Sequence, residues 1–250
     1  MVDWITQQIP PTQRSAERRV WGPWQADDAE NTDVRFVMTR EPASAIFGLF
    51  YQVRDSRRRD DFTFDEGWSN CVFGQVEPSG EGLRRGQGNL TIDLDVCARY
   101  SQTGERGLAS VGFNTSPDAD NPSGKTSLQI VFDDFLTLDQ IEEHGDLAQA
   151  TNATYLYIES SAERRFDFLF FADVNGEPAG STELERVAIE VRWDEEGRGQ
   201  AAVSLSEGDF GALFIELNEC WDVEHARVYY KDSHDLAPEE GDSASCPVLD

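Results

Sequence analysis

Alternation of apolar and polar residues with a period of two is the clearest pattern in this chain, and it is best developed over residues 86–100. There, Leu90, Ile92, Leu94 and Val96 alternate with polar residues. A period of two places the aliphatic side chains on one face of a strand and the polar side chains on the other. We therefore predict a single strand here, with a buried face and an exposed acidic face, in an antiparallel sheet covered on one side.

The same kind of pattern predicts strands along the rest of the chain. The other expected strands cover residues 20–24, 34–39, 45–53, 62–76, 107–114, 128–132, 154–158, 165–172, 187–193, 201–205 and 213–217. No βαβ pattern and no internal repeat interrupts the series. We predict an all-β fold, an antiparallel meander of about ten to twelve strands. It would close into a barrel or curl into a half-barrel of lipocalin-like or lipoprotein-carrier-like type, with a two-sheet β-sandwich as the alternative.

Three segments depart from the strand pattern. Residues 1–19 carry a weak apolar cluster followed by two prolines and a polar run, which predicts a short N-terminal helix and a tether before a single β domain over residues 20–250. A helix is expected over residues 139–150, with Asp139 and Glu142 as a capping pair. The Asp-Val-Asn-Gly sequence at 173–176 predicts a tight hairpin turn, since Asn-Gly favours positive φ.

The charge of the chain excludes one class of partner. With 48 acidic and 21 basic residues, the formal net charge is -27. The field of such a protein repels the phosphate backbone, so we expect no nucleic-acid binding. No run of about twenty apolar residues is present, so no transmembrane segment is expected. The arginines at 57–59 lie among aspartates, and a solvated hairpin loop over 54–61 accounts for them better than an anion site does.

The four cysteines predict the compartment. Cys71, Cys97, Cys220 and Cys246 form an even set, with equal separations within 71/97 and 220/246. Of the three possible connectivities we favour Cys71 with Cys97 and Cys220 with Cys246, and the absence of C-x-x-C spacing favours disulfides over metal thiolates. Disulfides indicate an oxidising compartment, hence secretion or the cell envelope. The first ten residues lack the regions of a signal peptide, so this expectation assumes an upstream signal.

A calcium loop is the one cofactor site that the sequence suggests. Asp118 and Asp120 lie in an Asp-Ala-Asp-Asn-Pro-Ser-Gly segment that has part of the spacing of a calcium-binding loop. It fails the EF-hand pattern, because Pro122 replaces the third acidic ligand and Gln129 stands at the twelfth position. An ordinary Asp/Pro turn is the simpler interpretation, and no other cofactor is expected.

Candidate catalytic and sugar-stacking residues each have a simpler interpretation. Asp93 and Asp95 would project from the same face of one strand, as paired-carboxylate glycosidases require, but the E-x-D-x-x-E pattern of jelly-roll glucanases is missing and a solvated acidic strand face is the simpler account. Trp21 and Trp24 could form a sugar-stacking platform, and packing within the first strand is the favoured alternative. No serine has a histidine partner in a known hydrolase pattern, and His225 is interpreted as a surface or packing residue.

Three segments together resemble a family. They are Val20-Trp-Gly-Pro-Trp24, the Gly-x-Gly-x-Leu-x-Ile-Asp strand at 86–93, and the ending Glu219-Cys-Trp-Asp with Tyr-Tyr-Lys-Asp and Cys246-Pro. Over residues 20–250 the chain resembles uncharacterised envelope lipoproteins of myxobacterial type. Such proteins carry a lipobox cysteine upstream, which this sequence does not contain. The resemblance implies no activity and no functional residues.

These observations lead to three functional hypotheses. The first is a non-catalytic secreted or cell-envelope protein, monomeric, acting as a structural or interaction module with a protein partner. The second is a carrier of a hydrophobic small molecule or lipid inside the barrel, which its aromatic residues motivate. The third is a carbohydrate-active enzyme using paired carboxylates. The aromatic residues in question are Phe47, Phe50, Tyr155, Tyr157, Phe166, Phe168, Phe170 and Phe171.

Overall fold

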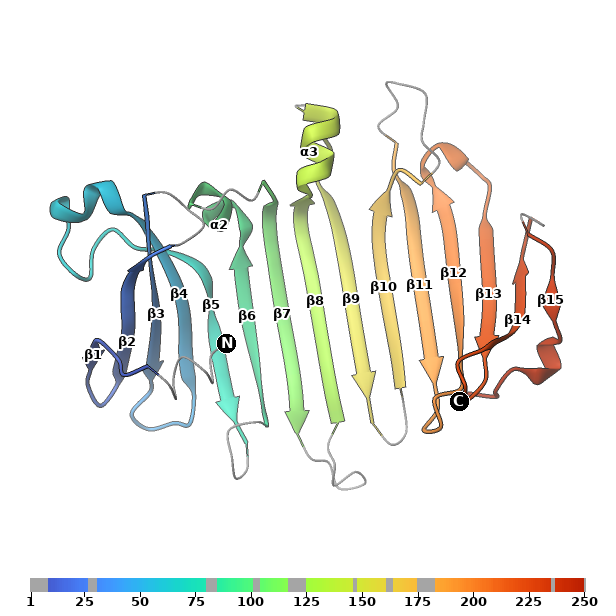
Figure 1. Cartoon of the computed structure of the whole chain (residues 1–250), viewed down its shortest axis with the longest axis horizontal. Helices are drawn as coiled ribbons and strands as arrows, with labels where there is room; N and C mark the ends of the chain where they lie inside the picture. Colours follow the sequence, from blue (N-terminus) through green and yellow to red (C-terminus); the bar gives the residue numbers. More distant parts are fainter. Residues whose placement is uncertain are drawn as a thin grey trace. The chain divides into compact units, whose positions relative to one another are not determined.

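The chain folds as one antiparallel meander in which strand order follows chain order (Figure 1). The computed structural model describes residues 9–26, 31–79, 85–100, 104–116, 125–145, 148–160, 164–174, 183–234 and 237–249. Among these residues the sheet runs from β1 to β15, and no ladder joins those two strands. The expected all-β meander is therefore confirmed, with fifteen strands in the described chain and an open sheet in place of a closed barrel or a sandwich.

The elements have the following bounds. The first seven strands are β1 (Gln13–Arg14), β2 (Arg18–Gln25), β3 (Thr32–Arg40), β4 (Phe47–Asp55), β5 (Ser69–Pro78), β6 (Gly86–Asp93) and β7 (Arg106–Ser116). The others are β8 (Lys125–Leu136), β9 (Thr151–Glu159), β10 (Arg164–Ala172), β11 (Glu185–Trp193), β12 (Gly199–Glu207), β13 (Ile215–Trp221), β14 (Arg227–Asp232) and β15 (Glu240–Gly241). Two short α-helices, α2 (Leu94–Tyr100) and α3 (Leu138–His144), and the 3₁₀ turns η1 (Ser56–Asp61), η3 (Gly208–Phe210) and η4 (Ser243–Ser245) connect them.

The chain divides into two compact units. Unit 1 comprises residues 1–113 and 133–146, and unit 2 comprises residues 114–132 and 147–250. Each unit holds a run of consecutive antiparallel strands, β2 to β6 in unit 1 and β9 to β14 in unit 2, and the register shifts in the ladders β2–β3, β4–β5 and β13–β14. A single β domain over residues 20–250 stays a prediction.

Unit 1 has its core on β2, β3 and β4. Its buried apolar side chains include Val20, Trp21, Phe36, Val37 and Val53, of which Val20 and Trp21 are fully buried. The indole N–H of Trp21 donates to the carbonyl of Ile9 at 2.9 Å, and its ring lies 5.5 Å from that of Phe36. Trp24 is 38% exposed, whereas Trp21 is 1% exposed. The two indoles therefore do not share one open surface, and Trp21 is a packing residue.

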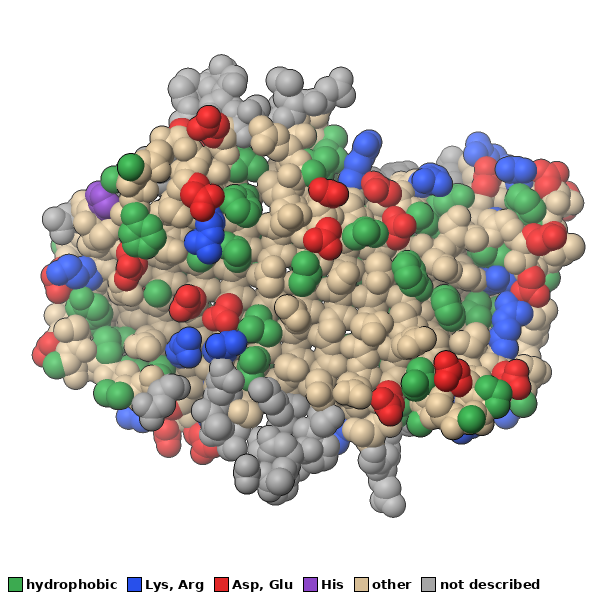
Figure 2. All heavy atoms as spheres, turned by 180° about the vertical axis from the view of Figure 1, so that it is seen from behind, with side chains coloured by type: hydrophobic (Ala, Val, Ile, Leu, Met, Phe, Trp, Pro, Cys, Tyr) green, Lys and Arg blue, Asp and Glu red, His purple; other side chains and the backbone are tan. Residues whose placement is uncertain are grey.

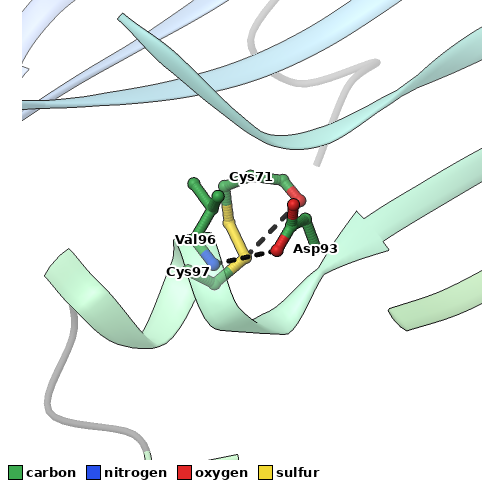
Figure 3. The surroundings of a disulfide bond; sticks show 4 residues. All are labelled: Cys71, Asp93, Val96 and Cys97. Atoms are coloured by element: carbon green, nitrogen blue, oxygen red, sulfur yellow. Dashed lines mark hydrogen bonds between the residues drawn. A yellow bond between two sulfur atoms is a disulfide. The ribbon is translucent and has the colours of Figure 1, made fainter. Parts of the chain in front are cut away.

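The stretch predicted as one strand over residues 86–100 is half strand and half helix, so that prediction was wrong beyond Asp93. Strand β6 ends at Asp93, whose carboxylate accepts a hydrogen bond from the backbone N–H of Val96 at 2.9 Å (Figure 3). A side-chain acceptor three residues before that N–H caps the first turn of a helix. Cys97, one turn into α2, is bonded to Cys71 of β5, and this bond holds the short helix against the sheet.

The arginine-rich segment of unit 1 is exposed over residues 57–61, as predicted, but its first residue, Arg54, is buried. Arg54 is 3% exposed at the end of β4 and forms an ion pair with the fully buried Asp33 at 3.2 Å. Arg59, on η1, forms a second ion pair with the same carboxylate. The guanidinium groups of Arg54 and Arg35 each lie 4.3 Å from the ring of Trp68. These arginines therefore fasten the segment that follows β4 to the sheet.

The other three local predictions have different outcomes. Residues 1–8, where the N-terminal helix was expected, lie outside the described residues, and residues 13–14 form strand β1 where a tether was expected. The helix expected over 139–150 is α3, which is shorter and is capped by Thr137 with Gln140 in place of the pair Asp139 and Glu142. The ladder of β10 with β11 ends at Ala172 opposite Glu185, and residues 175–176 of the predicted turn lie outside the described part.

Both predicted disulfides are confirmed. Cys71 is bonded to Cys97 within unit 1, and Cys220 is bonded to Cys246 within unit 2, each with a sequence separation of 26 residues. The second bond attaches the segment after β15 to strand β13. No helix among the described residues is long and apolar enough to span a membrane.

Candidate functional site

The paired carboxylates of the enzyme hypothesis do not share a strand face. Asp93 ends β6 and caps α2, whereas Asp95 lies in the first turn of that helix. The Asp93 carboxylate is therefore engaged in holding a backbone N–H. The structure does not support these two residues as an acid and base pair.

The described residues support neither a calcium-binding site nor an anion-binding site. Asp118 and Asp120 lie outside the described residues, and within the described ranges no group of three or more His, Cys, Asp or Glu side chains could hold a metal ion. The arginines at 57–59 are each paired with an aspartate of the same unit, Asp55, Asp61 and Asp33 respectively. Those guanidinium groups stabilise the fold locally.

The pKa of Asp33 shows that the neighbouring arginines stabilise its charged form. Burial by itself raises the pKa of the Asp33 carboxyl, but hydrogen bonds from Arg59 and Arg54 outweigh it and hold the pKa below its ordinary value. Burial likewise lowers the pKa of Arg35 to about 10, an effect that the neighbouring Arg18 reinforces and Asp65 opposes. The charges of this cluster are paired with one another, although the buried Nε of Arg54 has no hydrogen-bond partner among the described residues, and the cluster has a structural role.

The aromatic residues that suggested a carrier gather mainly on one face of unit 2. The pairing registers of β9 to β13 place alternate residues of each strand side by side. On this face Phe168 stacks on Phe170 at 4.7 Å, and Tyr155 lies 4.9 Å from Phe166. The face consists of Ala153, Tyr155, Tyr157, Phe166, Phe168, Phe170, Val187, Ile189, Val191, Trp193, Ala201, Val203, Leu205, Ile215 and Leu217.

This apolar face lies on an open sheet. Phe166, Phe168 and Phe170 are half-buried, and Phe171 lies on the opposite face of β10 by alternation. That opposite face is mixed, with Ile158 and Leu169 on it beside the ion pair of Arg165 with Asp167 at 3.3 Å. Figure 2 shows a molecular face on which acidic and basic side chains are interspersed among hydrophobic ones. The described residues of β9 to β13 thus form an aromatic surface on one face of the sheet, and the carrier hypothesis stays a prediction.

A pocket lies at one end of the apolar face of unit 2. Its volume is about 430 Å³, and we call it the indole pocket. Its lining is Trp193, Gly197, Glu219, Cys220, Trp221, His225 and Arg227. Pockets of about 300–1,000 Å³ are typical of small-molecule sites.

The pairing register explains how two tryptophans reach one pocket. Trp193 pairs with Gly199 on β12, and Gly199 pairs with Trp221 on β13. The two tryptophans are therefore two strand spacings apart, about 10 Å between backbones, with no side chain on the strand between them. The indole of Trp221 packs against the Cα of Gly199, in the space where any other residue would place a Cβ. Its N–H donates to the carbonyl of Gly197 at 2.8 Å, which fixes the ring.

Some polar side chains of the pocket already interact with other residues of the protein, and others can hydrogen-bond a ligand. Arg227 forms an ion pair with Glu240 at 2.8 Å and lies over the ring of Tyr230 at 5.0 Å. Within the described part of the chain, by contrast, no group hydrogen-bonds the Glu219 carboxylate, the His225 imidazole or the Trp193 indole N–H. The pocket therefore presents an acceptor, a donor and an imidazole beside two aromatic surfaces.

A tyrosine next to the pocket extends the aromatic surface. The ring of Tyr157 lies 5.9 Å from that of Trp193, and its hydroxyl donates to Glu159 at 2.7 Å. Burial and the nearby Glu159 carboxylate raise the pKa of Tyr157 to about 12. Tyr157 therefore stays neutral at physiological pH.

None of these residues was expected at a binding site from the sequence. Trp193 was expected at the end of an alternating strand, and His225 as a surface or packing residue. The available signal was a tryptophan at the end of one predicted strand and a second tryptophan four residues after another, with Gly199 between them in the sequence. Its meaning depends on the register of β11, β12 and β13, which local patterns do not define.

Comparison with known proteins adds no relative. No protein-family profile, no curated protein and no solved structure matches this chain.

Proposed function

We propose that this protein is a non-catalytic binding module of an oxidising, extracytoplasmic compartment, and that the indole pocket of unit 2 holds its ligand. The compartment follows from the two disulfides, because such bonds persist outside the reducing cytosol. The meander then serves as a scaffold that positions the pocket residues on adjacent strands.

The observation that carries the proposal is the chemistry of the pocket lining. Trp193 and Trp221 supply large aromatic surfaces, while Glu219 and His225 supply polar groups that the described chain leaves without hydrogen bonds. Binding sites for small molecules combine apolar and aromatic walls with a few polar groups that fix orientation. The disulfided Cys220 in the lining is fully buried and anchors strand β13 beneath the site.

The lining favours holding a ligand over cleaving it. Hydrolysis of a glycosidic bond by the common mechanism needs two carboxyl groups flanking that bond. Among the described residues that line the pocket, Glu219 is the carboxylate, and its strand neighbours on the same face are Leu217 and Trp221. We therefore propose a binding function, and we expect the protein to release its ligand chemically unchanged.

Thermal unfolding of the oxidised full chain tests this proposal against probes of different classes. The probes are neutral oligosaccharides, choline, laurate and inorganic phosphate, each added in millimolar concentration. A ligand that binds only the folded state raises the melting temperature. We expect at least one class to do so in the parent protein and to lose the effect in Trp221→Ala.

The control variant is Trp24→Ala, which removes an indole of similar chemistry from unit 1. It should retain the ligand-dependent shift. Mass spectrometry of the probe after overnight incubation should show no product. The proposal fails if no class stabilises the parent protein, if Trp221→Ala responds like the parent, or if the probe is converted.

A further inference from the structure

We infer that the ligand of the indole pocket is a neutral saccharide that stacks on the pocket indoles, an inference that rests on the binding function proposed above. A sugar ring has an apolar face of C–H groups and an edge of hydroxyls that both donate and accept. The pocket offers the matching surfaces, two indoles and a set of unpaired polar groups of both kinds.

A purely apolar ligand fits the pocket less well. It would cover the Glu219 carboxylate and the His225 imidazole without giving them hydrogen bonds. A polar group removed from water without a partner loses free energy, and a charged group loses more. The hydroxyls of a saccharide replace the water that these groups give up.

Anionic ligands are disfavoured by the electrostatics of the site. An anion meets a molecule of net charge -27 and, in the pocket, the carboxylate of Glu219. A cation is attracted by the same charges and is opposed in the described lining only by the guanidinium of Arg227, which is already paired with Glu240 at 2.8 Å, so choline is the competing probe that matters most. A neutral saccharide avoids the repulsion that an anion meets and still uses Glu219 as an acceptor.

The geometry assigns separate roles to the lining residues. The Trp221 ring is fixed by its hydrogen bond to Gly197 and by packing on Gly199, so it is a preorganised stacking surface. Glu219 lies on the same strand two residues before it and accepts from hydroxyls at the edge of a stacked ring. The free indole N–H of Trp193 donates from across β12.

The experiment is titration of the oxidised full chain by calorimetry and by tryptophan fluorescence. The saccharide probes are neutral oligosaccharides of glucose, mannose, galactose and N-acetylglucosamine, and the competing probes are choline, laurate and phosphate. We expect one or more saccharides to bind with a change in tryptophan emission. Trp221→Ala should weaken binding by at least about tenfold, as removal of a central aromatic contact does. Glu219→Gln should weaken it by about threefold to tenfold.

Two matched controls and one geometric variant sharpen the test. Trp24→Ala and Glu190→Gln change the same residue types away from the pocket and should bind as the parent protein does. Gly199→Ala keeps every lining side chain but displaces the Trp221 indole, and it should weaken binding by about as much as Trp221→Ala. Because Glu219 is exposed, Glu219→Gln keeps the test decisive even where Trp221→Ala does not fold.

Each other outcome overturns the inference in a recognisable way. Choline, laurate or phosphate binding that depends on Trp221, with no saccharide bound, overturns the saccharide inference and leaves the binding function standing. A saccharide that binds the parent protein, Trp221→Ala and Glu219→Gln equally places the site elsewhere. If no probe of any class binds, the proposed function fails as well.

Discussion

The two disulfides provide an internal comparison, because both close loops of the same length in different units. Each joins cysteines 26 residues apart. In the chain-entropy treatment, the loss of unfolded-state entropy depends on loop length and amounts to about 3.5 kcal/mol for a loop of this size. Equal loops therefore predict equal stabilisation, provided that the folded state is unchanged when the bond is removed.

The folded surroundings of the two bonds differ, and this difference sets the expected result. The Cys71–Cys97 bond fastens α2, a helix of 7 residues, to the sheet. A helix this short is not stable by itself in water, so removing the bond also frees α2. The Cys220–Cys246 bond fastens a chain end whose 3₁₀ turn is already exposed. We expect the double variant Cys71→Ala with Cys97→Ala to lose more than about 3.5 kcal/mol and Cys220→Ala with Cys246→Ala to lose about that amount.

Urea unfolding monitored by circular dichroism and tryptophan fluorescence measures both losses. Alanine is used because Cys71 and Cys220 are buried and a serine hydroxyl would be left there without a partner. If the two units unfold in separate transitions, each double variant should shift one transition and leave the other in place. A loss below about 1 kcal/mol in either variant, or a larger loss for Cys220 with Cys246, would refute the reasoning.

Three further predictions follow from single contacts. Asp33→Asn should lower the free energy of unfolding by about 3 kcal/mol near neutral pH, because it leaves the buried Arg54 without its carboxylate. The pKa of Asp33 is held below its unfolded value of about 3.9, so its contribution is complete above that pH and is lost as the pH falls further. Melting temperatures of parent and variant should therefore converge below about pH 4, and a constant gap there would contradict this. Gly199→Ala should lower the free energy of unfolding by about 1–3 kcal/mol, because the added methyl group overpacks the space that the Trp221 indole fills. It should also shift tryptophan emission to longer wavelength as that indole moves into water. Unchanged emission would disprove the contact between Trp221 and Gly199. Thr137→Ala should remove the capping box of α3 at a cost of about 1 kcal/mol, seen as faster amide exchange of residues 138–141 and not elsewhere.

Much of the fold was predictable because period-two alternation is a local property. It located strands throughout both units, and even numbers and equal spacings of cysteines indicated the correct disulfides. The pattern misled where Leu94 and Val96 continued the alternation into α2. Two features favour a helix there, the capping carboxylate of Asp93 and the disulfide from Cys97 to Cys71. Only the first can be read from the sequence of the segment itself.

The buried charges and the candidate site could not be predicted from local sequence patterns, because both depend on contacts between segments that are distant in the sequence. Arginine side chains are usually solvated, and nothing in the local sequence marks Arg35 or Arg54 as different. Both are 3% exposed because Trp68 and the segment before it fold back over them. The indole pocket likewise forms only when three strands pair in one register. A slip of one residue would carry Trp221 to the opposite face of the sheet.

The ends of the meander have a consequence for self-association. An open sheet presents unpaired N–H and C=O groups at its first and last strands, and such rows recruit other chains into fibrils or swapped assemblies. Here the terminal strands β1 and β15 are two residues long. The Cys220–Cys246 bond lies just beyond β15 and keeps that short strand on β14. Reduction would release β15 and uncover Tyr229 and Tyr230, the two β14 residues that pair with it, so we expect the bond that stabilises unit 2 also to shield this edge from pairing with other chains.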